Sequence, residues 1–487
     1  MQATNLLKRP RLRTVENLTE ERHASWLELF FDLVFVVAVA QVAHNLSEDL
    51  TAQGLLRYGA LFALVWWAWV GYSFYSDRFE SNDTTYRVLM FAGMLAVTAL
   101  AVNVHDALGS GARAFALSYT AVRVVLVVLY LRARKRVPVA RDLCTRYSIG
   151  FGVGVALWLL SVFVPAPYRF MLWAAGFAVE LLTPLFSASV IRRTPYDATH
   201  IPERFGLFTI IVLGEAVLAV ATGITDAKWQ LASSLVAAAG FAIAACLWWI
   251  YFDFVEGYAL LRRGWLAAGQ VYVYGHLPVV LGVTAAGVGV KQAILESGNT
   301  ALTGGARWTL CGGLALFLLS ISAIRIAARR THLIRARMVT AGVILFSAFV
   351  GAYVAPLLLI CVVLGALAAE VGLEVFGEAR AAGAEAKQDE PETQCAHLDQ
   401  IRRVAPDNAG CGECLALGDT WVELRMCRSC GHVGCCDNSK YKHATMHFQA
   451  TDHPIIKSFE ANEDWSWCYV DQIYLPTAEG SLTAQTG

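Results

Sequence analysis

Residues 26–38 read WLELFFDLVFVVA, an apolar run that only two acidic residues, Glu28 and Asp32, interrupt. Further apolar segments follow it, each of roughly 17 to 25 residues, the length that crosses a hydrocarbon core of about 30 Å. Across the chain, 56% of residues are hydrophobic and 16% are charged, which is too apolar for a protein surrounded by water. The sequence predicts an all-α polytopic bundle of about twelve membrane spans over residues 26–376, centred near residues 36, 64, 95, 124, 155, 179, 212, 242, 282, 317, 345 and 363. Only residues 351–356 separate the last two, so a single broken helix would also fit there.

The charges predict the orientation of these spans. Lys plus Arg and Asp plus Glu each total 39, and this balance excludes a globally basic nucleic-acid-binding protein. Residues 1–25 and the even-numbered loops carry 22 Lys and Arg residues, whereas the loops on the other side carry 6. By the positive-inside rule, residues 1–25 form a basic cytosolic N-terminus and both chain ends are cytoplasmic. The sequence therefore predicts a multi-pass protein of the cell (inner) membrane. Residues 1–25 lack the short apolar core of a signal peptide, so the first span is expected to stay as an anchor.

An internal repeat is visible within the spans. The stretch WWAW at 66–69 matches WWIY at 248–251, and FDLV at 31–34 aligns with GEAV at 214–217. These offsets predict two parallel halves of six spans each, as in carriers whose pathway lies between two bundles. The alternative is that the paired tryptophans only form interfacial belts.

Ionisable residues inside the spans are the candidate functional groups, because a charge near the bilayer centre costs at least about 2.5 to 3.5 kcal/mol. Glu28 and Asp32 are four residues apart and share one helix face. Glu215 is the repeat mate of Asp32, so the two acids are expected to meet in one polar cavity between the halves. The predicted ion or substrate pathway comprises Glu28, Asp32, Arg123, Glu180, Glu203 and Glu215. The alternatives are that Glu28 pairs with Arg22 or a loop at the interface, and that the other residues form structural ion pairs between helices.

Two stretches resemble a known family. WLELFFDLVFVVA (26–38) and HIPERFGLFTIIVLGEAV (200–217) are similar to motifs of the low-temperature-requirement A (LtrA) family of bacterial membrane proteins, over about residues 20–376. The resemblance implies a multi-spanning membrane protein. It implies little about chemistry, because the activity of the family is poorly defined.

The rest of the chain differs in composition. Residues 377–393 (GEARAAGAEAKQDEPET) are small and charged, which is typical of a linker. A compact domain is expected over residues 394–474, and a disordered tail over 475–487. Closely spaced cysteines and histidines crowd into this domain, as in CAH at 395–397, CGEC at 411–414 and CRSC at 427–430. Such pairs are zinc ligands, and a small domain needs the binding energy of the metal to fold. Disulfides are the rival interpretation, which the cytosolic placement and the interleaved histidines disfavour.

The domain is similar to the ubiquitin-hydrolase-type (UBP-type) zinc finger, through CAHL, CGEC, CRSCGHVGC, HATMHF, HPI and WCYVD. The resemblance implies a small α+β fold with two to three structural zinc ions. It implies three ligand sets: first Cys411, Cys414, Cys435 and His443; second Cys427, Cys430, His447 and His453; third Cys395, His397 and Cys468, with Asp471 where many members have cysteine. His432 and Cys436 are spare donors.

The same resemblance bears on partners. Eukaryotic members capture the C-terminal carboxylate of ubiquitin with an aromatic pocket and an arginine close after a cysteine of the central site. Here Asp437 takes the place of that cation, which argues against ubiquitin binding. Trp467 and Tyr469 are the candidate walls of a peptide pocket, or they fill the core of the domain.

Enzyme signatures such as HExxH, GxSxG and the Walker loop are absent from the sequence, so no enzymatic activity is expected. The leading hypothesis is a proton- or cation-linked transporter or channel with a cytosolic zinc-binding module for regulation or partner binding. Its expected partners are the lipid bilayer, a small ion or solute, and a cytosolic protein or peptide, with no role for nucleic acid. The alternative hypothesis is a membrane-anchored scaffold or sensor that does not transport; an intramembrane enzyme is a weaker one.

Overall fold

The computed structural model describes residues 11–12, 25–80, 83–191, 200–252, 266–327, 333–388, 395–461, 463–471 and 473–475. The chain divides into two compact units, Met1–Gly377 and Glu378–Gly487. Each unit is described by itself.

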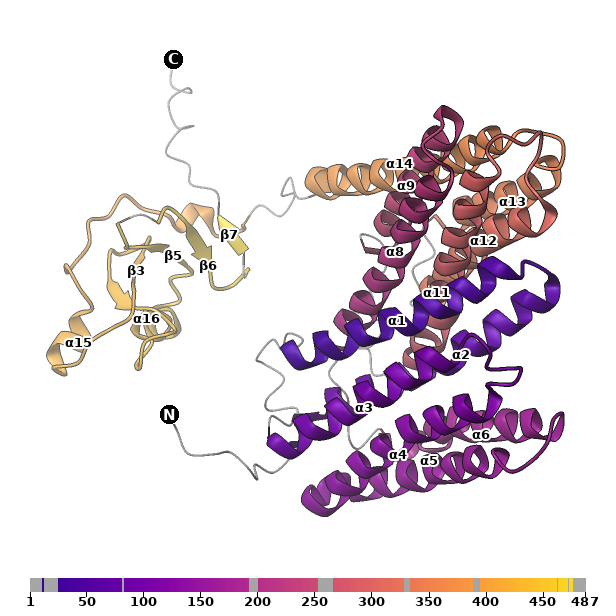
Figure 1. Ribbon diagram of the computed structural model, residues 1–487. Helices are drawn as coiled ribbons and strands as arrows, with labels where there is room; N and C mark the ends of the chain where they lie inside the picture. The colour runs from indigo at the N-terminus through magenta and orange to yellow at the C-terminus, as the bar shows by residue number, and fades with distance from the viewer. Residues whose placement is uncertain are drawn as a thin grey trace. The chain divides into compact units, whose positions relative to one another are not determined.

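The N-terminal unit is helical (Figure 1). Its long helices are α1 (Trp26–Glu48), α2 (Ala52–Arg78), α3 (Thr84–Asn103), α4 (Ala112–Arg136), α5 (Arg141–Ser161), α6 (Tyr168–Phe186), α8 (His200–Asp226), α9 (Leu231–Phe252), α11 (Leu266–Leu295), α12 (Gly304–Ala327), α13 (Ile334–Val350) and α14 (Pro356–Gln388). Every predicted span centre lies within one of them. Within the described residues, 11 helices are long and apolar enough to cross a membrane. The exception among those named is α13, which has 17 residues.

The last two helices form a hairpin, not one broken helix. Arg337, near the start of α13, lies 3.4 Å from Glu370 and also contacts Glu374, both in the second half of the apolar part of α14. Arg337 lies a similar number of residues before the connection as its partners lie after it. The two helices therefore run antiparallel.

Helix α1 is the central packing element of this unit. It contacts α2 and α3 on one side and α8 and α11 on the other (Figure 1). Its start is fixed by a capping box, in which Ser25 and Glu28 bond each other's backbone N–H groups. Helices α11 and α12 approach closely, since a Cβ on Gly282 would lie 2.5 Å from the carbonyl oxygen of Gly313.

Two short features lie outside the predicted spans. Within the basic N-terminal segment, β1 (Arg11–Leu12) pairs antiparallel with β2 (Phe79–Glu80), directly after α2. Helix α14 continues to Gln388, so the first part of the predicted linker is helical. In residues 377–388, alanine, glutamate and lysine, all strong helix formers, extend the helix. Residues 476–487 of the predicted disordered tail lie outside the described residues.

The C-terminal unit has a small α+β fold. Its antiparallel sheet has the strand order β4-β3-β5-β6-β7. The strands are β3 (Leu424–Cys427), β4 (Val433–Cys435), β5 (Ile455–Ser458), β6 (Ser466–Cys468) and β7 (Ile473–Leu475), with helices α15 (Gly412–Ala416) and α16 (His443–Thr451) beside them. Gly434 allows α16 to contact β4, since a Cβ there would lie 2.6 Å from the backbone nitrogen of Ala444.

Candidate functional site

A buried charge cluster joins the starts of α1 and α8 to the end of α2. Its first part is centred on Asp32, whose Oδ1 accepts hydrogen bonds from Trp69 Nε1 and Arg204 at 2.8 Å each. Arg204 also lies 3.3 Å from the hydroxyl of Ser73. All four side chains are almost fully buried. Asp32 is therefore a carboxylate paired between three helices, not an acid facing lipid.

The second part of the cluster is centred on His200, the first residue of α8. Its Nδ1 lies 3.0 Å from Asp77, and its Nε2 lies 3.8 Å from Glu28. The imidazole thus has a carboxylate on each side, and all three side chains are at most 1% exposed. Glu28 also accepts hydrogen bonds from the N–H and hydroxyl of Ser25. The predicted alternative partner of Glu28, Arg22, lies outside the described residues. We call Glu28, Asp32, Asp77, His200 and Arg204 the buried charge cluster.

Glu215 does not join this cluster, contrary to the expectation that it would share one cavity with Asp32. It lies on α8 eleven residues beyond Arg204, about 16 Å along the helix axis. There it lines a separate cavity between α1, α8 and α11, together with His44, Ser47, Thr222, Thr284 and Lys291. The repeat alignment had paired a stretch of α1 with a stretch of α8, and these two helices do pack together. Each acid nevertheless lies near a different cation, Arg204 or Lys291.

The remaining predicted pathway residues lie elsewhere. Arg123 on α4 and Glu180 on α6 form a fully buried ion pair at 2.5 Å, which Tyr119 completes by donating its hydroxyl to Glu180 at 2.9 Å. This pair fits the predicted alternative of a structural lock between helices. Glu203 is only half-buried.

Sequence reasoning missed four members or supporters of the cluster: Trp69, Asp77, His200 and Arg204. Three of them lie within the motifs WWAW (66–69) and HIPERF (200–205). The signal for Arg204 was its spacing of four residues from His200, which places both on one helix face. No pattern in the sequence pointed to a role for Asp77, because it looks like an ordinary acidic residue at the end of a membrane span.

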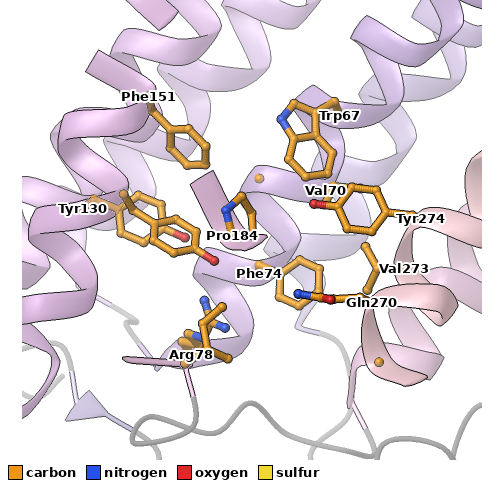
Figure 2. A pocket seen from close by; sticks show the side chains of 14 residues that line it. Trp67, Val70, Phe74, Arg78, Tyr130, Phe151, Pro184, Gln270, Val273 and Tyr274 are labelled. Atoms are coloured by element: carbon orange, nitrogen blue, oxygen red, sulfur yellow. The ribbon is translucent and has the colours of Figure 1, made fainter. Parts of the chain in front are cut away.

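An aromatic cavity lies beside the cluster, between α2, α4, α5, α6 and α11 (Figure 2). It is lined by Trp67, Phe74, Tyr130, Tyr147, Phe151 and Tyr274, with Arg78 at one end. Its empty volume is about 610 Å³, including space open to the outside. Sequence reasoning did not anticipate this cavity.

In the C-terminal unit, the predicted metal ligands gather in three groups. The central group is fully buried: His443 Nδ1 lies 3.1, 3.3 and 3.5 Å from the sulfurs of Cys411, Cys414 and Cys435. Around a tetrahedral zinc ion with bonds of about 2.0 to 2.3 Å, ligand atoms are separated by roughly 3.3 to 3.8 Å. The spacing of the central group therefore fits such an ion.

The other two groups have the same character. Cys427, Cys430, His447 and His453 form the second, with Cys430 Sγ 3.3 Å from His447 Nε2. In the third, His397 Nδ1 lies 2.9 Å from Asp471 and 3.7 Å from Cys468, and Cys395 completes the group. Asp471 thus stands beside the other donors as a fourth ligand would.

The spare donors have other contacts. Cys436 lies 3.5 Å from the hydroxyl of Ser439, and His432 Nε2 lies 2.6 Å from Glu413.

Burial raises the pKa of the Cys414 thiol to about 12, so the protonated thiol is favoured unless a cation balances the thiolate. The chemistry of all three donor sets is therefore that of zinc sites.

A pocket on the same unit lies beside β5, β6 and β7. Trp465, Trp467, Tyr469 and Tyr474 line it together with Arg425, Asp437 and Asn438. Its empty volume is about 590 Å³, including space open to the outside. Trp467 and Tyr469 thus form pocket walls, the first of the two predicted roles.

Comparisons with known proteins agree with both halves of this description. The family described as bacterial low temperature requirement A protein (LtrA) matches residues 23–371, and the family described as Zn-finger in ubiquitin-hydrolases and other protein matches residues 411–479. The uncharacterized protein RA0937 of Rhizobium meliloti (strain 1021) is 28% identical over 285 residues, which are 56% of this chain and 69% of that protein. Protein RPA1320 from Rhodopseudomonas palustris has a solution NMR structure that matches part of this chain at 53% sequence identity. The match covers 18% of this chain and 85% of that chain, with a TM-score of 0.17.

We predict that Asp32→Asn destabilises the membrane unit by about 3 to 5 kcal/mol, because it leaves Arg204 buried without its carboxylate. Asp226→Asn is the matched control: Asp226 is 57% exposed and 3.8 Å from Lys291, so its loss should cost less than about 1 kcal/mol. Thermal unfolding of the detergent-solubilised protein measures both. Equal melting temperatures for the two variants would contradict the assigned role of the pair.

Proposed function

The chain belongs to the bacterial low temperature requirement A (LtrA) family, and from that premise we propose that it is a proton- or cation-linked transporter or channel with a cytosolic zinc-binding module. In this proposal it resides in the cell (inner) membrane with both termini in the cytoplasm, and it has no enzymatic activity. The observation that carries the proposal is His200, buried with Asp77 at one ring nitrogen and Glu28 near the other.

This arrangement suits proton transfer. A neutral imidazole has one nitrogen that accepts a proton and one that releases it, so a carboxylate beside each nitrogen supplies both a donor and an acceptor. The buried charge cluster also brings three carboxylates together. In a low-dielectric interior, carboxylates that lie close to one another favour uptake of a proton or a cation.

We further propose that the route continues to the Glu215 cavity. The interface of α1 and α8 carries two polar stations, the buried charge cluster near the helix starts and Glu215 about three turns further along. Between them lie the buried apolar side chains of Phe35, Val39, Phe208 and Val212. In this proposal the apolar layer is the barrier that an ion or proton has to pass between the two stations. In the expected six-plus-six repeat, α1 and α8 would be the first helices of the two halves.

We predict that His200→Gln lowers proton flux at least about tenfold, because glutamine cannot take up and release a proton. The matched control is His276→Gln. His276 is equally buried, but its ring nitrogens contact the carbonyl of Tyr272 and the hydroxyl of Tyr251, not acids. Proteoliposomes containing a pH-sensitive dye and an imposed pH gradient provide the measurement.

Two outcomes would reject parts of this proposal. Wild-type flux in a folded His200→Gln protein would remove the relay. Wild-type flux in Glu215→Gln would instead remove the second station and leave the relay in place.

For the C-terminal unit, we propose three structural zinc ions, one in each donor group, with Asp471 completing the third. All four positions of each group are filled by protein donors, which suits a metal that stabilises the fold. Hydrogen bonds from Cys395 and His397 lower the pKa of Asp471, which favours the ionised carboxylate that a metal needs.

We predict that metal analysis of the full-length protein finds about three zinc ions per chain. Asp471→Ala should reduce this to about two, because the third group loses its fourth donor. Asp464→Ala removes an exposed acid of the same unit that belongs to none of the three groups, and it should retain the wild-type content. Two ions in the wild type would show that the third group does not hold zinc.

A second candidate function, recruitment of a cytosolic partner, is favoured by the pocket at Trp465, Trp467, Tyr469 and Tyr474. Asp437 and Arg425 are the charged residues of its described lining, and an acid beside the pocket already pairs with the arginine. Arg425 lies over the ring of Trp465 at 4.6 Å and is contacted by Glu423, while Asp437 stands exposed at the rim. Aromatic rings with surplus negative charge suit a cationic side chain. We propose that a basic peptide segment, not a peptide carboxylate, is the ligand.

We predict that a lysine-rich peptide binds the full-length protein in nanodiscs more tightly than a glutamate-rich peptide of equal length. Asp437→Asn should weaken that binding roughly two- to fivefold, as expected for one partly exposed charge pair. Asp464→Asn, an exposed acid outside the pocket lining, should leave it unchanged. Preference for a peptide ending in a free Gly-Gly carboxylate would overturn this assignment.

A further inference from the structure

The aromatic cavity beside the buried charge cluster has the chemistry of a ligand site. Figure 2 shows Trp67 and Tyr274 facing Tyr130 and Phe151 across it, with Phe74 between them and Arg78 at one end. The rings of Trp67 and Tyr274 stack at 5.7 Å with an interplanar angle of 22°. The walls therefore offer flat aromatic surface, against which another ring packs favourably in an offset or edge-on geometry.

In the uncharged part of this lining, two polar atoms have no hydrogen-bond partner among the described residues. They are the indole nitrogen of Trp67 and the hydroxyl of Tyr130, and both side chains are at least 97% buried. Native proteins pair nearly all such groups, because an unsatisfied buried donor costs about 1 to 3 kcal/mol. An indole N–H can only donate, and a phenol can donate or accept, so an acceptor atom of a ligand would satisfy either group.

The charge of the lining is cationic. Among its described residues, Arg78 alone carries a formal charge, and its guanidinium lies 5.7 Å from the ring centres of Phe74 and Tyr147. The neighbouring acid, Asp77, does not line the cavity; it contacts His200 of the buried charge cluster and also interacts electrostatically with Arg78. Arginine recognises carboxylates through its planar set of donors. One cation at the end of an apolar chamber therefore selects a ligand with one negative charge and an apolar body.

We infer that the aromatic cavity binds an aromatic monocarboxylate. The ring of the ligand lies between the walls of Trp67 and Tyr274 on one side and Tyr130 and Phe151 on the other. Its carboxylate is directed toward Arg78, and its acceptor atoms meet the donors that the protein leaves unpaired. The inference goes beyond the proposed function, because binding is measured without flux and stands whether or not the chain moves protons.

The test is equilibrium dialysis of the full-length protein in nanodiscs with labelled 1-naphthoate. Competition with unlabelled 1-naphthamide and decanoate separates the contributions of charge and ring. We expect saturable binding that 1-naphthoate displaces at least tenfold better than either competitor. Equal displacement by the amide would overturn the role of the charge, and stronger displacement by decanoate would assign the cavity to an alkyl chain instead.

Matched variants test the geometry. Tyr130→Phe removes one donor and keeps the ring, so the affinity should fall roughly tenfold, as expected for a hydrogen bond to a charged group. Tyr75→Phe removes a hydroxyl from another buried tyrosine that does not line the cavity, and its affinity should stay within about twofold. Trp67→Phe and Trp66→Phe form a second pair of the same kind, since Trp66 is buried but outside the lining. Equal affinities within both pairs would overturn the site. Failed binding with intact proton flux would remove this inference and leave the proposed function untouched.

Discussion

The membrane unit depends on one constraint: a charge removed from water must meet an opposite charge or a hydrogen-bonding partner inside the protein. The described helices obey it repeatedly. Asp32 meets Arg204 and Trp69, Glu180 meets Arg123 and Tyr119, and Glu370 and Glu374 meet Arg337. Each of these sets joins helices that are distant in sequence or, in the last case, the two arms of a hairpin. The acids thus determine which helices are neighbours, because any other arrangement would leave a bare charge in an apolar interior.

The C-terminal unit meets a different constraint, since a short chain with only small apolar clusters cannot stabilise a fold alone. Its apolar clusters are built partly from the metal donors themselves, Cys411, Cys414 and Cys435 in one and Cys395 and Cys468 in the other. Part of this core is therefore made of the metal donors. In the membrane unit the opposite holds: the charged sets are islands within a continuous apolar core.

The sequence predicted what local patterns encode. Hydropathy alone located the helices, and the close spacing of cysteines and histidines predicted a zinc-binding domain, because each signal lies within a short stretch of sequence. The division of the donors into three sets came from the resemblance to the UBP-type zinc finger. Which helices pair with each other across long separations could not be predicted from the sequence. No pattern in the sequence assigned a partner to Arg204 or to Asp77, although both belong to the buried charge cluster. The repeat suggested that Asp32 and Glu215 would converge, but equivalent helices can pack together while their equivalent residues stay turns apart. The extension of α14 to Gln388 was missed because a charged, alanine-rich stretch is typical of linkers and of helices alike.

The third donor group has a topological consequence. It joins residues near the start of the zinc domain to residues near its end, since His397 and Asp471 are 74 positions apart. A metal ion bound there would cross-link the polypeptide into a closed loop, and a closed loop has far fewer unfolded conformations than an open chain. This site also has an oxygen donor on an exposed side chain, so a bound metal would exchange there more readily than in the buried central group. Metal starvation would therefore first release the two ends of the domain from each other, while the strands between them stay assembled.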